Sequence, residues 1–199
     1  MGSQPQARPP FDPDKLHFEV RLPNQEYRFS QLILFIAERC KKDPTFSAIK
    51  LNKVLFYSDF EAYARLGTPI TGVAYQKLRL GPAPQAMPRI LDEMQQDKLI
   101  RIVKQVVRGA AARERVVPIR PPADPIFDRE EIDIVEQYIR LFWERSATWV
   151  SKYSHGMAWK LARLNELIPY DAVFISDAPI TQSEVDHVKE LAAEYGWNL

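Results

Sequence analysis

The 199-residue sequence is poor in cysteine, histidine and glycine, and each shortage excludes a class of site. Cys40 is the only cysteine, so the chain can form neither an internal disulfide nor a cysteine-based zinc cluster. The three histidines, His17, His155 and His187, lie far apart in the sequence and show no metal-ligand spacing. None of the seven glycines follows the spacing of a phosphate-binding loop. We therefore expect no metal and no cofactor.

Long apolar runs and targeting signals are also missing. No apolar run approaches the ~18 residues that span a bilayer, and residues 1–10 lack the apolar core of a secretory signal. Apolar residues make up 46% of the chain and charged residues 27%, as in ordinary soluble globular proteins. We expect a cytoplasmic protein with no membrane partner. Its length suits a single domain over residues 15–199, behind a disordered, proline-containing tail at residues 1–14.

The sequence offers little for catalysis. Ser154 and His155 could suggest a nucleophile and its base, but adjacent residues on a helix do not face each other. No nucleophile elbow and no HExxH motif is present. We expect His155 to be hydrogen-bonded within the fold and Cys40 to be a buried thiol at the end of an apolar helix. These observations indicate that the protein is not an enzyme.

Opposite charges are segregated along the chain, although the formal net charge is only +1. Residues 98–120 contain seven Lys or Arg and one Glu. Residues 121–199 contain seven Lys or Arg and fourteen Asp or Glu. Such segregation is typical of complementary faces, either within a fold or across the interface with a partner.

Hydrophobic periodicity predicts a mainly helical protein. A first helix is expected to begin after Ser30, which can cap its first turn. Residues 46–66 carry two apolar stripes and are followed by a Gly67 stop, which indicates a central helix buried on more than one side. The stretch VAYQKLRLGPAPQAM is expected to change from strand to helix at its turn, with a third helix beginning at Pro84.

The second half of the chain continues this pattern. Residues 99–119 predict a β-hairpin that resembles the wing of a winged-helix protein. A capping box at Asp128 starts the next helix, residues 148–164 are expected to form helical pieces interrupted at Gly156, and a last helix is expected over residues 181–196. The expected fold class is therefore mainly α (α+β): a compact helical domain with a central buried helix and a small β-hairpin.

Three helices followed by a basic hairpin also fit a DNA-binding protein. In a winged helix-turn-helix the third helix would enter the major groove, and the hairpin cations would contact phosphates. The third helix, however, carries Asp92, Glu93 and Asp97, which would repel the phosphate backbone. Nucleic acid is therefore the less favoured partner. The basic hairpin and the acidic C-terminal helices are instead the candidate contact regions for a protein partner, with Arg108, Arg113 and Arg115 as rim charges. The full set of hairpin cations is Arg101, Lys104, Arg108, Arg113 and Arg115.

Amphipathic aromatic residues provide a second set of candidates for partner binding. Tyrosine and tryptophan are enriched at the energetic centres of protein interfaces, although we expect most of those in this chain to be core residues. Tyr57, Tyr75 and Trp159 join the hairpin cations as the residues that we expect a partner to contact. The full set of such aromatic residues is Tyr57, Tyr63, Tyr75, Trp143, Trp149, Tyr153 and Trp159.

Several short motifs follow one another in a recognisable order. They are a helix motif IKLNKVLFY with Leu51, Lys53, Leu55, Phe56 and Tyr57, a link with Gly67 and Pro69, a segment with Ala74 and Tyr75, a corner at Gly81 and Pro82, and a group formed by Ser154, His155 and Trp159. With this order and spacing, residues 46–160 resemble the Panacea domain, also called the SocA-like antitoxin domain. Two departures are Leu80, where the family more often has an aromatic residue, and Pro84, which stiffens the corner.

The resemblance implies a mostly helical antitoxin that binds and neutralises a protein toxin encoded beside it. Some members are thought to hand the toxin to a protease, which makes a protease a second candidate partner. The alternatives are a winged-helix-like transcriptional regulator and a proteolytic adaptor or phage-associated interaction protein, and the oligomeric state stays open. The motif residues with an implied structural role are Leu51, Lys53, Leu55, Gly67, Gly81, Pro82 and His155.

Overall fold

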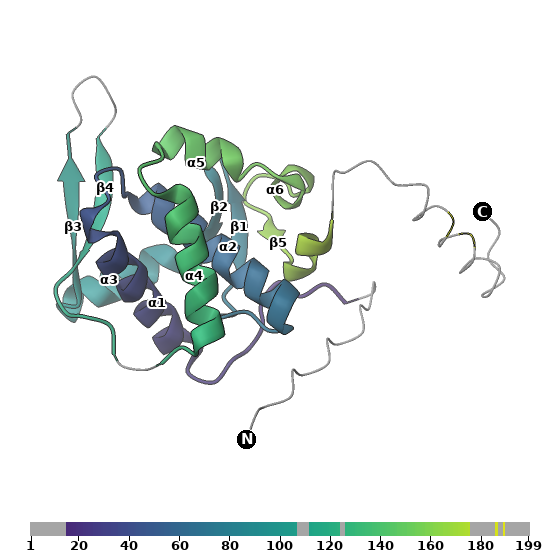
Figure 1. The fold of residues 1–199 in the computed structure, drawn as a ribbon, viewed down its shortest axis with the longest axis horizontal. Helices are drawn as coiled ribbons and strands as arrows, with labels where there is room; N and C mark the ends of the chain where they lie inside the picture. Colours follow the sequence, from purple (N-terminus) through teal and green to yellow (C-terminus); the bar gives the residue numbers. More distant parts are fainter. Residues whose placement is uncertain (1–14, 107–111, 124–125, 176–185, 187–188, 190–199) are drawn as a thin grey trace.

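The computed structural model describes residues 15–106, 112–123, 126–175, 186 and 189. Helices surround a small antiparallel sheet, and a separate hairpin extends from one side of the fold (Figure 1). The predicted tail at residues 1–14 lies outside the described residues, as does the predicted last helix apart from Asp186 and Lys189. None of the helices in the described part of the chain is long and apolar enough to cross a membrane.

The described elements confirm a mainly helical α+β fold. One sheet has the strand order β2-β1-β5, and β3 and β4 form a second sheet of two strands. The elements in chain order are α1 (Gln25–Arg39), η1 (Cys40–Lys42), α2 (Ala48–Leu66), β1 (Tyr75–Leu78), β2 (Gly81–Pro84), α3 (Met87–Gln96), β3 (Ile100–Gln105), β4 (Arg113–Pro118), α4 (Arg129–Phe142), α5 (Ala147–Tyr153), α6 (Met157–Leu161), β5 (Leu167–Ile168) and η2 (Tyr170–Phe174).

Helix α2 lies at the centre of the molecule. It contacts α1, α4, α5, β2, β4 and η2, so it has neighbours on every side (Figure 1). Leu51 and Leu55 are buried on one stripe, and Phe56 and Phe60 are buried on the other. Burying a large apolar side chain stabilises a fold by roughly 1.5–3 kcal/mol, so a helix that buries both stripes contributes much of the core. The predicted central buried helix is confirmed.

Both ends of α2 have the caps that their residue types favour. The Ser47 side chain accepts a hydrogen bond from the backbone N–H of Lys50, which satisfies one free donor of the first turn. Gly67 adopts a left-handed φ of 77° and donates its N–H to the carbonyl oxygen of Tyr63 at 3.1 Å. The predicted stop at Gly67 is therefore confirmed.

Two predicted helix starts are wrong. Helix α1 begins at Gln25, five residues before Ser30, whose hydroxyl donates to the carbonyl oxygen of Tyr27 inside the helix. The apolar stripe already includes Phe29, which is fully buried and therefore draws the preceding turn into the helix. Helix α3 begins at Met87 instead of Pro84, with Pro88 in its first turn, where a missing N–H costs nothing.

The stretch VAYQKLRLGPAPQAM forms a β-hairpin instead of a strand followed directly by a helix. Strand β1 pairs with β2 so that Tyr75 lies opposite Pro84 and Leu78 lies opposite Gly81. Pro82 and Pro84 have no N–H to donate, and they are tolerated because β2 is an edge strand. Gly81 has a φ of 99°, a backbone conformation that residues with a side chain rarely adopt.

The predictions for the second half of the chain are confirmed wherever residues are described. Strands β3 and β4 form the expected antiparallel hairpin, with Ile100 opposite Pro118. Asp128 and Glu131 make the predicted capping box at the start of α4. Helices α5 and α6 are separated at Gly156, which is the N-cap residue of α6.

Candidate partner-binding site

The basic hairpin presents its predicted cations in different settings. Arg101 and Lys104 lie exposed on β3, and Lys104 pairs across the hairpin with Glu114 at 3.9 Å. Arg113 and Arg115 lie two residues apart on β4, and both reach towards η1. Arg108 lies outside the described residues. The structure therefore brings two of the five predicted cations to one place.

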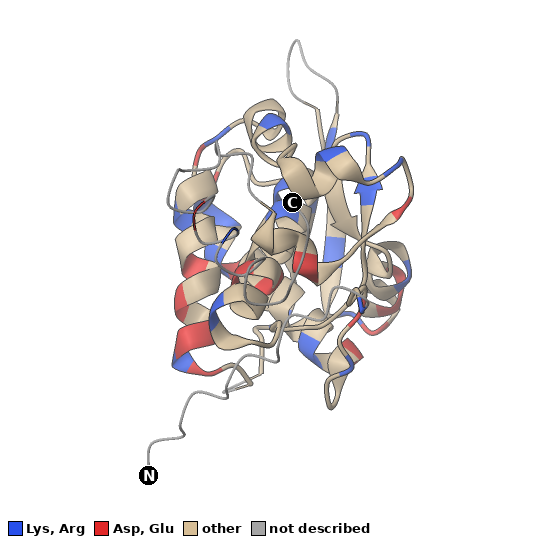
Figure 2. Ribbon diagram, turned by 90° about the vertical axis from the view of Figure 1, so that its right-hand side faces the viewer, with Lys and Arg blue, Asp and Glu red and all other residues tan. Residues whose placement is uncertain are grey.

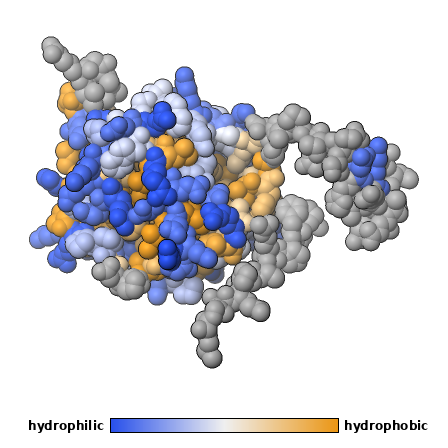
Figure 3. Space-filling view, viewed as in Figure 1, coloured by the Kyte–Doolittle hydropathy of each residue, from blue (hydrophilic) through white to orange (hydrophobic). Residues whose placement is uncertain are grey.

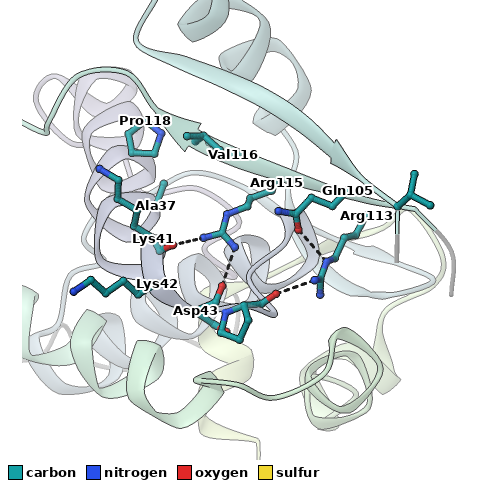
Figure 4. A pocket seen from close by; sticks show the side chains of 12 residues that line it. Ala37, Lys41, Lys42, Asp43, Gln105, Arg113, Arg115, Val116 and Pro118 are labelled. Carbon is teal, nitrogen blue, oxygen red and sulfur yellow. Dashed lines mark hydrogen bonds between the residues drawn. The ribbon is translucent and has the colours of Figure 1, made fainter. Parts of the chain in front are cut away.

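That place is a groove between η1 and the hairpin, which we call the basic groove. It has a volume of about 690 Å³. Lys41, Lys42, Arg113 and Gln105 surround it, and the end of α1 closes one side (Figure 4). The residues that line it are Ala37, Lys41, Lys42, Asp43, Pro44, Gln105, Val106, Arg113, Arg115, Val116, Val117 and Pro118.

Arg115 supports the groove from within. Its side chain is buried, and it donates to the carbonyl oxygens of Cys40 at 3.0 Å, Lys41 at 2.7 Å and Asp43 at 2.8 Å. The carbonyl oxygens of Cys40 and Asp43 also accept the backbone N–H groups of Asp43 and Phe46, so the guanidinium adds side-chain bonds to the turn that follows α1 (Figure 4). Arg115 also lies over the Phe46 ring. This corrects the prediction that Arg115 is a rim charge, because its charge is used inside the fold.

A buried ion pair lies under the same groove. Lys50 donates to Asp43 at 2.6 Å, and both side chains are almost fully buried. Burial alone would raise the pKa of Asp43, but the hydrogen bonds from Lys50 and Thr45 hold that pKa below its ordinary value. Because Asp43 is held by Lys50, Thr45 and Arg115 together, the turn after η1 has a fixed shape.

Cys40 lies beside this ion pair as a buried thiol. It is 3% exposed, and burial, with the nearby charge of Asp43, raises the pKa of its thiol to about 12. The thiol is therefore protonated at neutral pH and is a poor nucleophile. Among the described residues, no group of three or more His, Cys, Asp or Glu side chains is placed to hold a metal ion.

The remaining groove cations are available to a partner. Arg113 uses its guanidinium to contact Gln105 and the carbonyl oxygen of Pro44. Lys41 pairs with Glu38 at 3.3 Å on the surface, where such a pair contributes little. Lys42 is exposed and forms no ion pair with any described carboxylate. Lys41 and Lys42 were not among the predicted contact residues, and the fold places them at the same groove as Arg113.

The predicted aromatic contacts are divided between core and surface. Tyr75 is fully buried and donates its hydroxyl to Asp59 at 2.7 Å, which corrects its prediction as a contact residue. Tyr57 is half-buried and its hydroxyl donates to the carbonyl oxygen of Tyr153. Trp149 is 38% exposed and stacks on Tyr153, which is 45% exposed. These two residues of α5 are the exposed aromatic pair of this region.

A second exposed apolar area lies where α6 and η2 meet the surface. Figure 3 shows hydrophobic residues among polar ones in this part of the molecule. Leu161 and Leu164 are at least half exposed, as is Phe174 at the end of η2. Sequence periodicity did not mark these residues, because single leucines in short segments carry no regular pattern.

The family motifs, far apart in the sequence, meet at one point beside the β1–β2 hairpin. Lys53 of α2 donates to the carbonyl oxygen of Pro82 at 2.7 Å. A Cβ atom at Gly81 would lie only 2.1 Å from Oγ of Ser154 and 2.7 Å from Cε of Lys53. Glycine is therefore required where the hairpin passes between α2 and the end of α5.

Trp159 and His155 complete this motif cluster. The Trp159 indole N–H donates to the carbonyl oxygen of Leu78 at 2.9 Å, and its ring lies between the His155 ring and the ammonium group of Lys77. Nε2 of His155 is buried without a hydrogen-bond partner among the described residues, so His155 is held by stacking and not by the expected hydrogen bond. Burial lowers the pKa of His155, and Lys53 and Lys77 lower it further.

Comparisons with known proteins support the relation that these motifs indicate. Searches of curated proteins and of solved structures return no significant match. The family model described as Antitoxin SocA-like, Panacea domain matches residues 51–160, which include most of the central helix, both hairpins and the motif cluster. Since this match covers more than half of the chain, the protein belongs to the SocA-like, Panacea domain family of antitoxins.

Proposed function

We propose that this protein is an antitoxin that neutralises a cognate protein toxin by direct contact, without catalysis. Family membership supports an antitoxin-like role. The observation that carries the contact model is the basic groove, where Lys42 and Arg113 face a cavity of about 690 Å³ on a rigid frame. We infer that the toxin presents an acidic surface to this groove.

The frame gives the groove a preformed shape, which favours binding. Arg115 and the Asp43–Lys50 pair fix the groove floor before any partner arrives, so little conformational entropy is lost on association. The exposed cations at the rim would accelerate encounter with an acidic partner and exclude basic ones. Arg101 and Lys104 extend the positive charge along β3, and they serve the same purpose.

The exposed pair of Trp149 and Tyr153 is the second candidate contact. The two rings stack with centroids 5.2 Å apart, and Arg145 lies over the Trp149 ring at 5.0 Å. Tryptophan, tyrosine and arginine are the residues that most often dominate binding energy in interfaces. An already ordered stack loses little freedom when a partner covers it.

DNA binding is less well supported than toxin binding. Residues 67–86, which contain the β1–β2 hairpin, separate α2 from α3, so these helices do not form a helix-turn-helix. Asp92 and Glu93 of α3 are exposed, as is Asp97 at its C-cap, and Arg89 is occupied by Glu26 and Glu93. Figure 2 shows positive and negative residues interspersed over the visible side of the fold. A phosphate backbone would meet carboxylates wherever α3 approached it.

Co-expression with the product of the neighbouring gene tests the proposal. The wild-type protein should co-purify with that product and relieve its toxicity. A Lys42→Glu/Arg113→Glu variant should bind it about tenfold more weakly or worse, because two attractive charges become repulsive. Arg129→Glu, which reverses a 94% exposed charge on α4, is the matched control and should bind normally.

An inhibition assay with purified toxin and antitoxin then distinguishes neutralisation by occlusion from neutralisation by delivery to a protease. If contact alone neutralises the toxin, a stoichiometric amount of antitoxin should inhibit it with no protease present. A wild-type protein that neither co-purifies with its neighbour nor relieves its toxicity would contradict the proposed function. Normal binding by the doubly reversed variant would contradict the assignment of the basic groove.

A further inference from the structure

A second cavity lies between α2 and the β1–β2 hairpin, away from the basic groove. Its volume is about 270 Å³. The walls are mainly apolar, and the polar residues are grouped on α2 and at the hairpin turn. The residues that line this cavity are Ile49, Asn52, Lys53, Leu78, Arg79, Leu80, Gly81 and Ala83.

Lys53 is the unusual residue of this cavity. Its side chain is 2% exposed, and its ammonium group makes a single hydrogen bond, to the carbonyl oxygen of Pro82. An ammonium group has three N–H donors, so two remain without a partner in the described part of the chain. No described carboxylate pairs with Lys53. A buried cation without a counter-ion is costly, and an anionic ligand would remove that cost.

Other groups around the cavity favour an anion as well. Arg79 lines the cavity at the exposed hairpin turn and makes no ion pair with a described residue. Asn52 lines it from α2, and its Oδ1 is buried without a hydrogen-bond partner among the described residues. Because the amide oxygen and nitrogen can exchange places by a 180° rotation, Asn52 can turn its N–H₂ group towards an acceptor.

The walls restrict the kind of anion. Ile49, Leu78, Leu80 and Ala83 present aliphatic carbon, which suits a ligand with an apolar stem better than a strongly hydrated phosphate. We propose that this cavity binds a carboxylate carried on a short apolar stem, with Lys53 as its charge partner and Asn52 and Arg79 as additional donors. The stem fills the space against Leu78 and Leu80. This site is independent of toxin binding at the basic groove.

The protonation of Lys53 supports the same assignment. Burial lowers the pKa of Lys53 to about 7, so its amino group is only partly protonated at neutral pH when no anion is bound. The titratable groups nearest to it are His155, whose pKa responds to the charge of Lys53, and Arg79 at the turn, and both are basic. A carboxylate would be bound together with a proton, and its binding would weaken as the pH rises.

Two matched probe molecules test the site on the full-length protein. Butyrate carries the carboxylate and a short stem, and butyramide has the same shape without the charge. With the lysine side chains labelled for NMR, butyrate should shift the Lys53 signal saturably. Its apparent affinity should fall roughly tenfold between pH 6 and pH 8, as the protonated fraction of Lys53 falls. An equal response to butyrate and butyramide would overturn the proposal without any variant.

Variants locate the binding. Lys53→Met removes the charge with little change of volume and should abolish the preference for butyrate over butyramide. Arg79→Met, at the exposed turn, should weaken butyrate binding severalfold, whereas Arg129→Met removes a distant exposed charge and should have no effect. A folded Lys53→Met protein, checked by circular dichroism, that still prefers butyrate would overturn the proposal.

The carboxylate could come from a free short-chain acid or from a glutamate side chain of a protein partner. N-acetyl-glutamate N-methylamide and its glutamine counterpart represent the second source. Tighter binding of the blocked glutamate than of butyrate would assign the cavity to a protein side chain, and the reverse order would assign it to a free acid. If neither carboxylate binds saturably, the cavity has only a structural role.

Discussion

The ammonium group of Lys53 lies 2.7 Å from the carbonyl oxygen of Pro82, and this hydrogen bond joins the central helix to the edge strand of the sheet. Pro82 supplies the acceptor on β2, and Gly81 leaves the space through which the lysine reaches it. The contact is direct, buried and made by two residues of the family motif. The stability of the protein should therefore depend on whether Lys53 is charged.

The first prediction concerns the pH dependence of stability. The pKa of Lys53 is about 7 in the folded protein and near its ordinary 10.5 in the unfolded chain. Between these values the unfolded chain binds more protons, so the contribution of Lys53 to the free energy of unfolding rises with pH, by up to about 1.4 kcal/mol per pH unit. Below pH 7 both states are protonated and the full cost of the buried charge remains.

Lys53→Met isolates this effect. The gain in free energy of unfolding of Lys53→Met over the wild type should be largest at pH 6 to 7. It should become smaller as the pH rises to 9.5, because the wild type is then stabilised. Urea unfolding at several pH values measures it, and other titrating groups cancel in the difference. A difference that does not change with pH would show that Lys53 has an ordinary pKa in the fold.

The sequence predicted the residues of this contact but not the contact itself. Lys53 and Pro82 were placed in a family motif, and α2 was expected to be central, because its two apolar stripes can be read from periodicity. The local pattern nevertheless placed Pro84 at the start of a helix. Two prolines among the four residues Gly81–Pro84 argue against a strand. A strand is possible there only because β2 lies at the edge of the sheet, beside β1.

The second prediction is that Gly81→Ala strongly destabilises the protein. Its φ of 99° disfavours any side chain, and the added Cβ would lie 2.1 Å from Ser154 Oγ. Together, backbone strain and overpacking should lower the free energy of unfolding by about 2–4 kcal/mol. Gly156→Ala is the control, because its Cβ would meet nothing within 4 Å. Urea midpoints compare the two variants, and equal midpoints would contradict the packing described for Gly81.

The basic groove was only partly predictable, because local sequence does not show which cations the rest of the fold buries. Charge counting identified the hairpin cations, since basic residues gather between positions 98 and 120. It could not separate Arg113, which faces the groove, from Arg115, which is buried two residues later. That difference depends on the carbonyl groups at the end of α1, some 75 positions away in the chain. Tyr75 was misplaced for the same reason, because its partner Asp59 lies on another element.

The third prediction separates these two arginines. Arg115→Met removes the guanidinium donor from the carbonyl oxygen of Lys41, and leaves those of Cys40 and Asp43 with only their backbone donors. It should lower the free energy of unfolding by about 2–3 kcal/mol. Arg113→Met removes bonds at the surface and should cost less than about 1 kcal/mol. Thermal unfolding at one pH measures both. If the two variants were equally stable, Arg115 would not be the support of the groove.

The fourth prediction concerns the ion pair of Asp43 and Lys50 beneath the groove. Each side chain is almost fully buried, so removing one partner leaves the other charge unpaired. Lys50→Met and Asp43→Asn should each lower the free energy of unfolding by about 3 kcal/mol. The double variant should be more stable than the sum of the single effects predicts, by about 2 kcal/mol.

Acid provides an independent check on the same pair. The pKa of Asp43 is lower in the folded protein than in the unfolded chain, so its contribution to stability is complete above its ordinary pKa of 3.8 and is lost as the pH falls further. The stability difference between wild type and Asp43→Asn should therefore be constant between pH 5 and pH 7 and should shrink below about pH 4. A double-mutant cycle by urea unfolding at pH 7 and near pH 3 measures the coupling energy between Asp43 and Lys50. This energy should be large at pH 7 and smaller near pH 3, and an equal energy at both pH values would contradict the ion pair.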